Sequence, residues 1–398
     1  MSTFGFGIDN LIQDPKLSAD LHAKRIGLVA HPASVTTSGE HSLDALITNH
    51  HQIASAFGPQ HGLRGDKQDN MVESDDFIDP QHGIPVVSLY GTHRFPQPAM
   101  LSELDVVLYD LQDIGCRVYT YITTLRYFVE ACAEHGVELW VLDRPNPAGR
   151  PVDGLYLEET EKSFVGCDVL PMRHGLTVGE LANWFADQLS CQAPRIVPML
   201  GYDPGSLPGY GWPLARQPWI NPSPNASSLN MARCFSGTVL LEGTTLSEGR
   251  GTTIPLEVLG APDLPVDELI SAMDPSLLSG VRIRSCCFLP TFHKHVGELC
   301  RGFQLHTDFT DYQHELFRPY RLVACLLKSL RQLCPEYDLW RHHEYEYETG
   351  RVPIDVINGG SFLRRWVDDD SSDANALIEK LNWTAADWQQ RRQPYLLY

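Results

Sequence analysis

Positive charge is scarce in this chain of 398 residues, in which 31 Lys and Arg stand against 50 Asp and Glu, a formal net charge of −19. An acidic protein repels phosphate backbones and anionic lipid headgroups, so nucleic acids and membrane surfaces are poor candidate partners. No apolar run approaches the roughly 20 residues of a membrane-spanning helix, and no signal peptide is visible after Met1. We therefore expect a cytoplasmic protein, with its oligomeric state left open.

Sequence motifs that indicate a bound cofactor, a metal ion or a serine nucleophile are also missing. The 10 Cys include no Cys-x-x-Cys pair, so reduced and mostly buried thiols are expected. There is no Walker-type loop, no complete dinucleotide fingerprint, no His-Glu-x-x-His helix and no Gly-x-Ser-x-Gly nucleophile elbow. His50-His51 and His342-His343 lack flanking residues at ligand spacing. We expect neither a metal ion nor another cofactor.

Short apolar runs alternate with segments of helical period in the first 150 residues. Strands are predicted at Arg25 to Ala30, Gln52 to Phe57, Val86 to Tyr90, Asp105 to Tyr109 and Glu138 to Leu142. A crossover helix is predicted from about Tyr119 to Glu134, where Gly136 stops it. This alternation is typical of an α/β fold in which helices flank a mostly parallel sheet.

The rest of the chain changes character. Residues 150 to 235 are rich in Pro and Gly around a predicted helix at Val178 to Leu189. Beyond them we predict strands at Thr238 to Leu241, Val281 to Arg284 and Gly302 to Leu305, and helices near Pro319 to Gln332 and Ala374 to Leu381. The length suits two domains, because single cores stop growing beyond about 250 to 300 residues. We place them at residues 1–230 and 231–398, the second being a smaller α+β domain.

Polar loops rich in Gly and Pro follow every predicted strand of the first domain. They begin at His31, Gly58, Gly91, Asp110 and Asp143. In an open α/β sheet, ligands bind outside the carboxyl ends of the strands. These loops therefore predict a binding edge, since their Arg, His and Asp side chains exceed what turns require.

Carboxylates, arginines and aromatic residues gather in two of the Gly-rich segments. Asp113, Arg117, Tyr119 and Tyr121 come from one, and Glu242, Glu248 and Arg250 come from the other. Carboxylates can act as acid, base or nucleophile, Arg can hold anionic groups, and aromatic rings can cover a sugar. The pattern indicates a sugar site. Equally, Arg250 and Glu248 can form a structural pair, and the two tyrosines can simply pack at the start of the helix.

Several longer motifs resemble the YbbC-like family. They are GPQHGLRG (58–65), SLYG (88–91), DLQDIGCRVYTYI (110–122), LDRPNP (142–147), RHGLTVGELA (173–182), PSPN (222–225), LLEGTTLSEGRGTT (240–253), PTFHKH (290–295) and YLLY (395–398). The characterised members are exo-β-N-acetylmuramidases of the NamZ type. The resemblance implies a Rossmann-like N-terminal domain, a smaller C-terminal domain and an active-site cleft between them. It also implies release of N-acetylmuramic acid from the non-reducing ends of peptidoglycan fragments, in cell-wall recycling.

One departure from the family pattern concerns catalysis. The family typically reads Pro-Glu-His-Gly where this chain reads Pro59-Gln60-His61-Gly62, and its Gln-Ala-Gly becomes Gln68-Asp69-Asn70. An amide can hydrogen-bond a glycosidic oxygen but cannot protonate it. Asp66, Asp69 and Glu73 are the neighbouring carboxylates that we consider as substitutes for the missing Glu. The alternatives are a non-hydrolytic sugar-binding protein and a glycosidase for a different amino sugar.

The candidate site residues follow from these motifs. The catalytic candidates are Gln60, which occupies the position of the family's Glu, and the carboxylates Asp113, Glu242 and Glu248. The substrate-binding candidates are His61, Arg64, Arg117, Tyr119, Tyr121, Asp143, Asn146, His174, Asn225 and Arg250. Because muramic acid carries a carboxylate, we expect Arg64, Arg117 and Arg250 to make the cleft locally positive. This island of three arginines would contrast with the acidic exterior of the protein.

Overall fold

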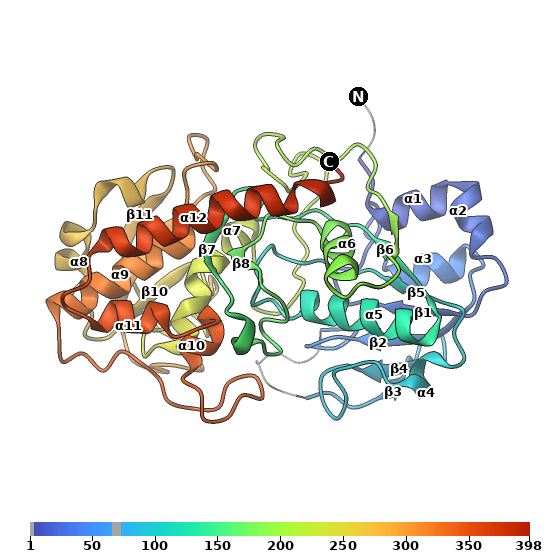
Figure 1. Cartoon of the computed structure of the whole chain (residues 1–398), viewed down its shortest axis with the longest axis horizontal. Coiled ribbons are helices and arrows are strands. Elements are labelled where there is room, and N and C mark those ends of the chain that lie inside the picture. Colours follow the sequence, from blue (N-terminus) through green and yellow to red (C-terminus); the bar gives the residue numbers. More distant parts are fainter. Residues whose placement is uncertain (1–3, 66–72) are drawn as a thin grey trace.

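The computed structural model describes residues 4–65 and 73–398. A large, mostly parallel sheet with its helices forms one half of the molecule, and a small antiparallel sheet with further helices forms the other (Figure 1). The predicted α/β fold with a smaller α+β domain is confirmed.

The seven strands of the large sheet lie in the order β3-β4-β2-β1-β5-β6-β9. Their bounds are β1 Ile26–Val29, β2 Ile53–Gly58, β3 Phe77–Ile78, β4 Pro85–Ser88, β5 Val106–Tyr109, β6 Glu138–Leu142 and β9 Arg195–Val197. All neighbours are parallel except β3 and β4. Apart from the edge strand β3, this is the order of a doubly wound Rossmann sheet, with the switch point between β1 and β5. The five predicted strands are all present.

Helices cover both faces of this sheet, because side chains of successive strand residues point to opposite sides. Leu28 and Leu108 pack on one face with α1 (Gly7–Gln13), α2 (Pro15–Asp20) and α3 (Ser42–Thr48). Val29 and Tyr109 pack on the other face with α4 (Pro98–Leu101), α5 (Tyr121–His135) and α6 (Val178–Gln188). The strand ends therefore stay uncovered, and their loops are free to build a site.

The smaller domain contains the three-stranded antiparallel sheet β10-β12-β11. Its elements are α7 Leu229–Thr238, β10 Val258–Ala261, α8 Val266–Ala272, β11 Arg282–Phe288, β12 Cys300–His306, α9 Pro319–Leu333, α10 Pro353–Asn358 and α11 Phe362–Asp368. Short 3₁₀ helices are η1 Glu159–Glu161, η2 Val239–Gly243, η3 Pro275–Leu278 and η4 Gln393–Tyr395. The prediction of a strand at Thr238 to Leu241 is wrong: this segment is helical and wholly buried. Core packing on all sides outweighs its β propensity.

The two halves share their cores. A two-stranded sheet of β7 (Asp153–Tyr156) and β8 (Pro171–Arg173) lies between them, and α12 (Ala374–Arg392) runs across both halves (Figure 1). Near the end of α12, Trp388 packs against Trp184 of α6 with ring centroids 4.7 Å apart. The core of the smaller domain in turn includes Ile114 and Val118. We propose that the boundary nevertheless lies near residue 230, at the start of α7.

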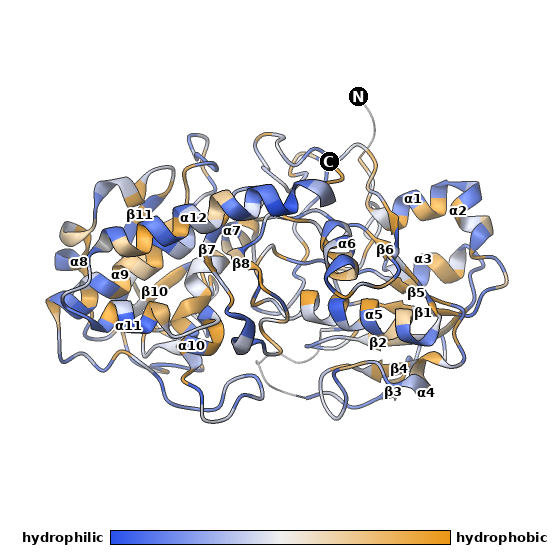
Figure 2. Cartoon of the chain, in the orientation of Figure 1, coloured by the Kyte–Doolittle hydropathy of each residue, from blue (hydrophilic) through white to orange (hydrophobic). Residues whose placement is uncertain are grey.

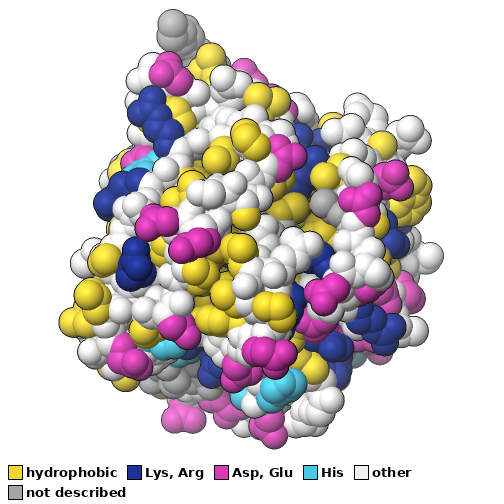
Figure 3. Space-filling view, turned by 90° about the vertical axis from the view of Figure 1, so that its left-hand side faces the viewer, with side chains coloured by type: hydrophobic (Ala, Val, Ile, Leu, Met, Phe, Trp, Pro, Cys, Tyr) yellow, Lys and Arg dark blue, Asp and Glu magenta, His cyan; other side chains and the backbone are white. Residues whose placement is uncertain are grey.

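Surface and interior differ clearly in polarity. Figure 2 shows hydrophobic strands in the large sheet and hydrophilic outer faces on the helices, α12 among them. Figure 3 shows acidic, basic and hydrophobic side chains intermixed on the exposed end of the smaller domain, without one continuous basic surface. Within residues 4–65 and 73–398, no helix is both long enough and apolar enough to span a bilayer.

Candidate active site

Gln60 lies in the tight loop that follows β2. The next two residues, His61 and Gly62, have φ values of 70° and 79°, a left-handed turn that reverses the chain beyond the strand end. The Gln60 side chain is only 7% exposed. Thr120 Oγ1 donates to Gln60 Oε1 at 2.7 Å, and Gln60 Nε2 donates to Glu346 Oε1 at 3.1 Å. The amide is thus held between the start of α5 and a carboxylate from the smaller domain.

Glu346 comes from a turn in which Tyr345 and Glu348 form an isolated bridge. Its side chain is buried, at 3% exposure, and the Tyr90 hydroxyl donates to Glu346 Oε2 at 2.8 Å. Burial raises the pKa of Glu346, and the Glu242 carboxylate adds to this rise. The hydrogen bonds from Tyr90 and Gln60 and the charge of Arg250 oppose it without cancelling it. Glu346 is therefore a buried carboxylate that holds its proton more tightly than usual.

Glu242 is the second carboxylate of the site and lies on η2. Arg250 Nη2 donates to Glu242 Oε1 at 2.7 Å, and the Tyr345 hydroxyl donates to Glu242 Oε2 at 2.6 Å. Arg250 Nη1 is buried and makes no hydrogen bond within the described residues. A buried N–H group that lacks an acceptor costs free energy. A ligand oxygen that accepts from Arg250 Nη1 would remove this cost, so we regard the nitrogen as a donor for a ligand.

Glu248 lies behind Arg250 and is fully buried. Glu248 Oε2 lies 2.7 Å from Lys294 Nζ, and Glu248 Oε1 lies 3.3 Å from Arg250 Nε. Burial alone would raise the pKa of Glu248, but the charge of Lys294, the hydrogen bond from His293 and the charge of Arg250 lower it overall. We infer that Glu248 anchors Arg250 as a structural partner, the alternative that the sequence left open.

These side chains meet in a pocket, called the inner pocket below, between the strand ends and the smaller domain. Its polar lining consists of Gln60, His61, Tyr119, Thr120, Ser223, Asn225, Glu242, Arg250, Tyr345 and Glu346. Its apolar lining consists of Val118, Val165, Met231, Phe235, Val239 and Leu256. A lining that combines polar and apolar groups suits a sugar ring with an acyl substituent. The free space is about 50 Å³, so the pocket must widen to admit a pyranose.

A second, wider hollow adjoins the inner pocket and is called the outer pocket. It holds about 370 Å³ and is lined by Arg94, Arg126, Tyr127, Lys162, Ser163, Phe164, Cys167, Glu346, Tyr347 and Glu348. The guanidinium of Arg94 stacks on Tyr347 at 3.8 Å from the ring centroid. Aromatic faces with charged and polar neighbours suit further sugar units. Glu346 lines both pockets.

Six of the predicted site residues line the inner pocket: Gln60, His61, Tyr119, Asn225, Glu242 and Arg250. Tyr121 lies next to it, with its ring 4.7 Å from that of Tyr119 and its hydroxyl donating to the Pro222 carbonyl at 2.8 Å. The two tyrosines thus differ: Tyr119 faces the pocket, whereas Tyr121 supports the loop that carries Asn225.

Four other predicted residues organise loops at the strand ends. Asp113 Oδ2 accepts from the Gly115 amide at 2.7 Å and lies 3.6 Å from His174 Nε2. Asn146 Oδ1 accepts from the Ala148 amide at 2.9 Å. Asp143 accepts from the Arg144 and Gly179 amides and from the Thr177 and Tyr398 hydroxyls. None of Asp113, Asp143, Asn146 and His174 lines the inner pocket.

The expected island of three arginines is not what the structure contains. Arg117 is fully buried, and its guanidinium donates to four carbonyl oxygens, those of Leu155, Leu170, Ile357 and Asn358. It ties the two halves together and has no terminal N–H group left for a substrate carboxylate. Arg64 donates to Asp79 at 2.8 Å and lies outside the inner pocket. Only Arg250 remains, and Glu242 and Glu248 balance its charge.

The proposed substitutes for a carboxylate at position 60 lie close together in the sequence, at positions 66, 69 and 73. Asp66 and Asp69, with the Gln68-Asp69-Asn70 segment, lie outside the described residues. Glu73 is exposed, and its Oε1 lies 3.5 Å from the Tyr347 hydroxyl, toward the outer pocket. It does not line the inner pocket.

Sequence reasoning missed the residues that complete the site: Tyr90, Thr120, Tyr345 and Glu346. Two of them, Tyr90 and Thr120, lie within motifs that the family resemblance had already marked. The alternating Tyr345-Glu346-Tyr347-Glu348 run was the available signal for the others. It follows no strand of the large sheet, so the rule about strand ends could not select it.

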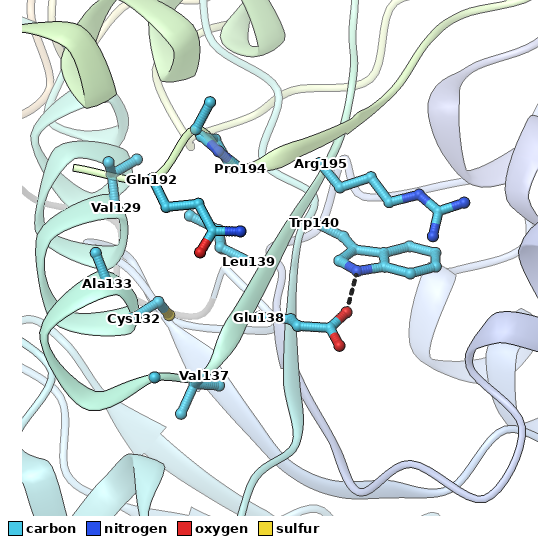
Figure 4. Close-up of a pocket in the computed structure, with 12 residues that line it drawn as sticks. Val129, Cys132, Ala133, Val137, Glu138, Leu139, Trp140, Gln192, Pro194 and Arg195 are labelled. Carbon is cyan, nitrogen blue, oxygen red and sulfur yellow. Dashed lines mark hydrogen bonds between the residues drawn. The ribbon is translucent and has the colours of Figure 1, made fainter.

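Another cavity, of about 340 Å³, lies at the opposite edge of the large sheet. Figure 4 shows Trp140 donating to Glu138, with Arg195 beside the indole. This cavity lies at the amino ends of the strands, because Glu138 is the first residue of β6 and Arg195 is the first residue of β9. Ligands of open α/β sheets bind at the carboxyl ends of strands instead, so we assign this cavity no catalytic role.

Fold and site together define a two-domain α/β protein with a carboxylate-lined pocket between a Rossmann-like sheet and a smaller domain. The chain belongs to the exo-β-N-acetylmuramidase NamZ family. The family's N-terminal description matches residues 26–230, and its C-terminal description matches residues 233–398.

Known proteins resemble the chain over its whole length. It is 38% identical over 395 residues to the peptidoglycan β-N-acetylmuramidase NamZ of Bacillus subtilis (strain 168), a match that covers 98% of this chain and 91% of that protein. A crystal structure of a DUF1343 family protein from Bacteroides fragilis matches with a TM-score of 0.85 at 28% identity, covering 99% of both chains. A second protein of that family from the same organism matches with a TM-score of 0.75 at 25% identity, covering 100% and 99%.

Proposed function

We propose that this protein is an exo-acting β-N-acetylmuramidase that hydrolyses N-acetylmuramic acid from the non-reducing ends of peptidoglycan fragments. The observation that carries the proposal is the pair of buried carboxylates, Glu242 and Glu346, in one pocket of a chain that matches the family from end to end. Glycosidases typically use two carboxyl groups, one on each side of the scissile bond. Release of muramic acid would serve cell-wall recycling. Location in the cytoplasm stays a prediction.

Recognition of the sugar follows from the lining of the inner pocket. The lactyl carboxylate of muramic acid needs a cationic donor, and Arg250 Nη1 is a buried donor without a partner among the described residues. The rings of Tyr119 and Tyr345 offer apolar faces, and Asn225 and Ser223 offer groups for hydroxyls or the acetamido substituent.

The test is hydrolysis of 4-nitrophenyl N-acetyl-β-muramide, with the corresponding N-acetyl-β-glucosaminide as the matched control that lacks the lactyl group. We expect nitrophenol release from the muramide and at least tenfold lower kcat/KM for the control, equivalent to about 1.4 kcal/mol of lost transition-state binding. Equal rates for both glycosides would contradict the assigned sugar. No binding of either muramic acid or its glycosides would point to a different glycan.

A second candidate function is a sugar-binding protein without hydrolytic activity, and Gln60 is the observation that favours it. If the family mechanism needs a carboxylate at position 60, the chain as written binds muramyl sugars without turnover. Calorimetric binding of N-acetylmuramic acid, together with no detectable nitrophenol release, would establish this function. Measurable release would exclude it.

A further inference from the structure

The amide at position 60 leaves one catalytic duty without its usual carboxylate. A leaving sugar departs as an alkoxide unless an acid protonates it, and Gln60 has no proton of suitable acidity to give. Glu346 is the carboxylate that contacts this amide, at 3.1 Å from Gln60 Nε2. We propose that Glu346 is the general acid of this enzyme and protonates the oxygen of the leaving group. The inference rests on the proposed function and assigns its proton donor.

The position of Glu346 suits an acid that acts on a bond between two sugars. It is the one described residue that lines both the inner and the outer pocket. A glycan that occupies both pockets must pass its bridging oxygen beside the residue that separates them. A general acid has to lie within about 2.6 to 3.2 Å of that oxygen, or reach it through one water molecule. No other described carboxylate has this position.

The surroundings of Glu346 keep a proton available. Its pKa is raised from the usual value, first by burial and then by Glu242, against the hydrogen bonds from Tyr90 and Gln60 and the charge of Arg250. Tyr345 and Tyr347 flank it on its own turn, Tyr345 bonded to Glu242 and Tyr347 beside Arg94. In contrast, Glu242 is in a 2.7 Å ion pair with Arg250. Environments that treat two carboxyls differently are how glycosidases separate acid from base.

The proposed step moves one proton from Glu346 to the leaving group and consumes one water molecule. The Glu346 carboxyl gives its proton to the bridging oxygen while the bond from that oxygen to the anomeric carbon breaks. The bonding electron pair stays on the oxygen, so the leaving sugar departs as a neutral alcohol. One water molecule adds to the anomeric carbon and gives a proton to a carboxylate, for which Glu242 is placed. Solvent then returns the proton to Glu346 and removes the one from Glu242.

The test compares leaving groups in the Glu346→Gln variant. With the disaccharide of N-acetylmuramic acid and N-acetylglucosamine, whose leaving alcohol needs a proton, we expect kcat to fall about 10²- to 10⁴-fold. With 2,4-dinitrophenyl N-acetyl-β-muramide, whose leaving phenolate is stable without a proton, we expect a fall of less than about tenfold, since little acid catalysis is lost. The exposed Glu344→Gln change, two residues away in the same turn region, is the matched control and should leave both rates unchanged.

The outcomes separate this inference from the proposed function. If the unmodified protein releases no muramic acid from either substrate, the proposed function fails. If it does, and Glu346→Gln lowers kcat equally for both substrates or for neither, the assignment of the acid fails while the function stands. A Gln60→Glu change that turns an inert protein into an active one would also overturn the assignment. The thermal unfolding midpoint of each variant is also measured, so that a loss of activity caused by unfolding can be distinguished from the loss of the general acid.

Discussion

Two buried glutamates a few side chains apart have opposite surroundings. Glu248 faces Lys294, Arg250 and His293, which together outweigh burial and lower its pKa. Glu346 faces Tyr90, Gln60 and Glu242, and burial prevails, so its pKa is raised. Burial alone therefore does not distinguish a structural carboxylate from a catalytic candidate. The sign of the neighbouring charges does, because each charged partner favours or disfavours the ionised form.

The largest expected effect on stability comes from Glu248. Changing Glu248→Gln leaves the buried ammonium of Lys294 without its counter-charge, whereas Arg250 keeps its ion pair with Glu242. Breaking a buried ion pair by removing one partner costs about 3 to 5 kcal/mol. Urea denaturation should show a loss of this size, whereas Glu346→Gln should cost far less. A loss for Glu248→Gln below about 1 kcal/mol would remove the contrast between the two residues.

The next effect concerns the pH dependence of stability. Because the folded-state pKa of Glu346 lies above its unfolded value, the protonated carboxyl stabilises the fold at low pH, and this contribution is lost as pH rises through the folded pKa. Glu346→Gln has no such titration. The free energy of unfolding of the variant relative to the unmodified protein should therefore increase as pH rises from about 4 toward neutrality. A constant difference across this window would contradict the raised pKa.

A third change adds a negative charge beside Glu346. In the Gln60→Glu variant, the two carboxyls contact each other and titrate as a pair, so repulsion between the two negative charges raises the pKa for loss of the second proton. Activity needs Glu346 protonated, so the alkaline limb of kcat/KM should move to higher pH by about one unit. The profile is measured with 4-nitrophenyl N-acetyl-β-muramide, and Gln52→Glu, in an exposed position just before β2, serves as the charge control. An unmoved limb would show that another group sets it.

The smallest expected effect comes from removing one hydrogen bond to Glu346. Tyr90→Phe removes the donor at 2.8 Å from Glu346 Oε2, a bond that lowers the pKa of Glu346. The alkaline limb of kcat/KM should shift upward by a fraction of a unit. Stability should fall by about 0.5 to 1.5 kcal/mol, the usual net worth of one hydrogen bond. A downward shift of the limb would mean that Tyr90 acts on the rate in some other way.

Residues at the strand ends show how far sequence reasoning reached. The loops after β2 and β5 were expected to meet at one edge, and Gln60 indeed accepts from Thr120 there. The same reasoning assigned Arg117 to the substrate, although four carbonyl oxygens occupy its terminal nitrogens. A guanidinium that binds a ligand and one that binds the backbone look alike in a motif. Only the packing of β7, β8 and α10 around Arg117 tells them apart.

The sequence by itself determined the fold class, the five main strands of the large sheet and the edge at which the site lies. These features depend on local periodicity and on the geometry of parallel strands, both of which can be read along the chain. Only the tertiary structure decided which carboxylates meet. Gln60 and Glu346 are 286 positions apart, and their contact exists because the smaller domain packs its Tyr345–Glu348 turn against the strand ends. Whether a buried acid keeps or loses its proton depends on such neighbours, which no local pattern records.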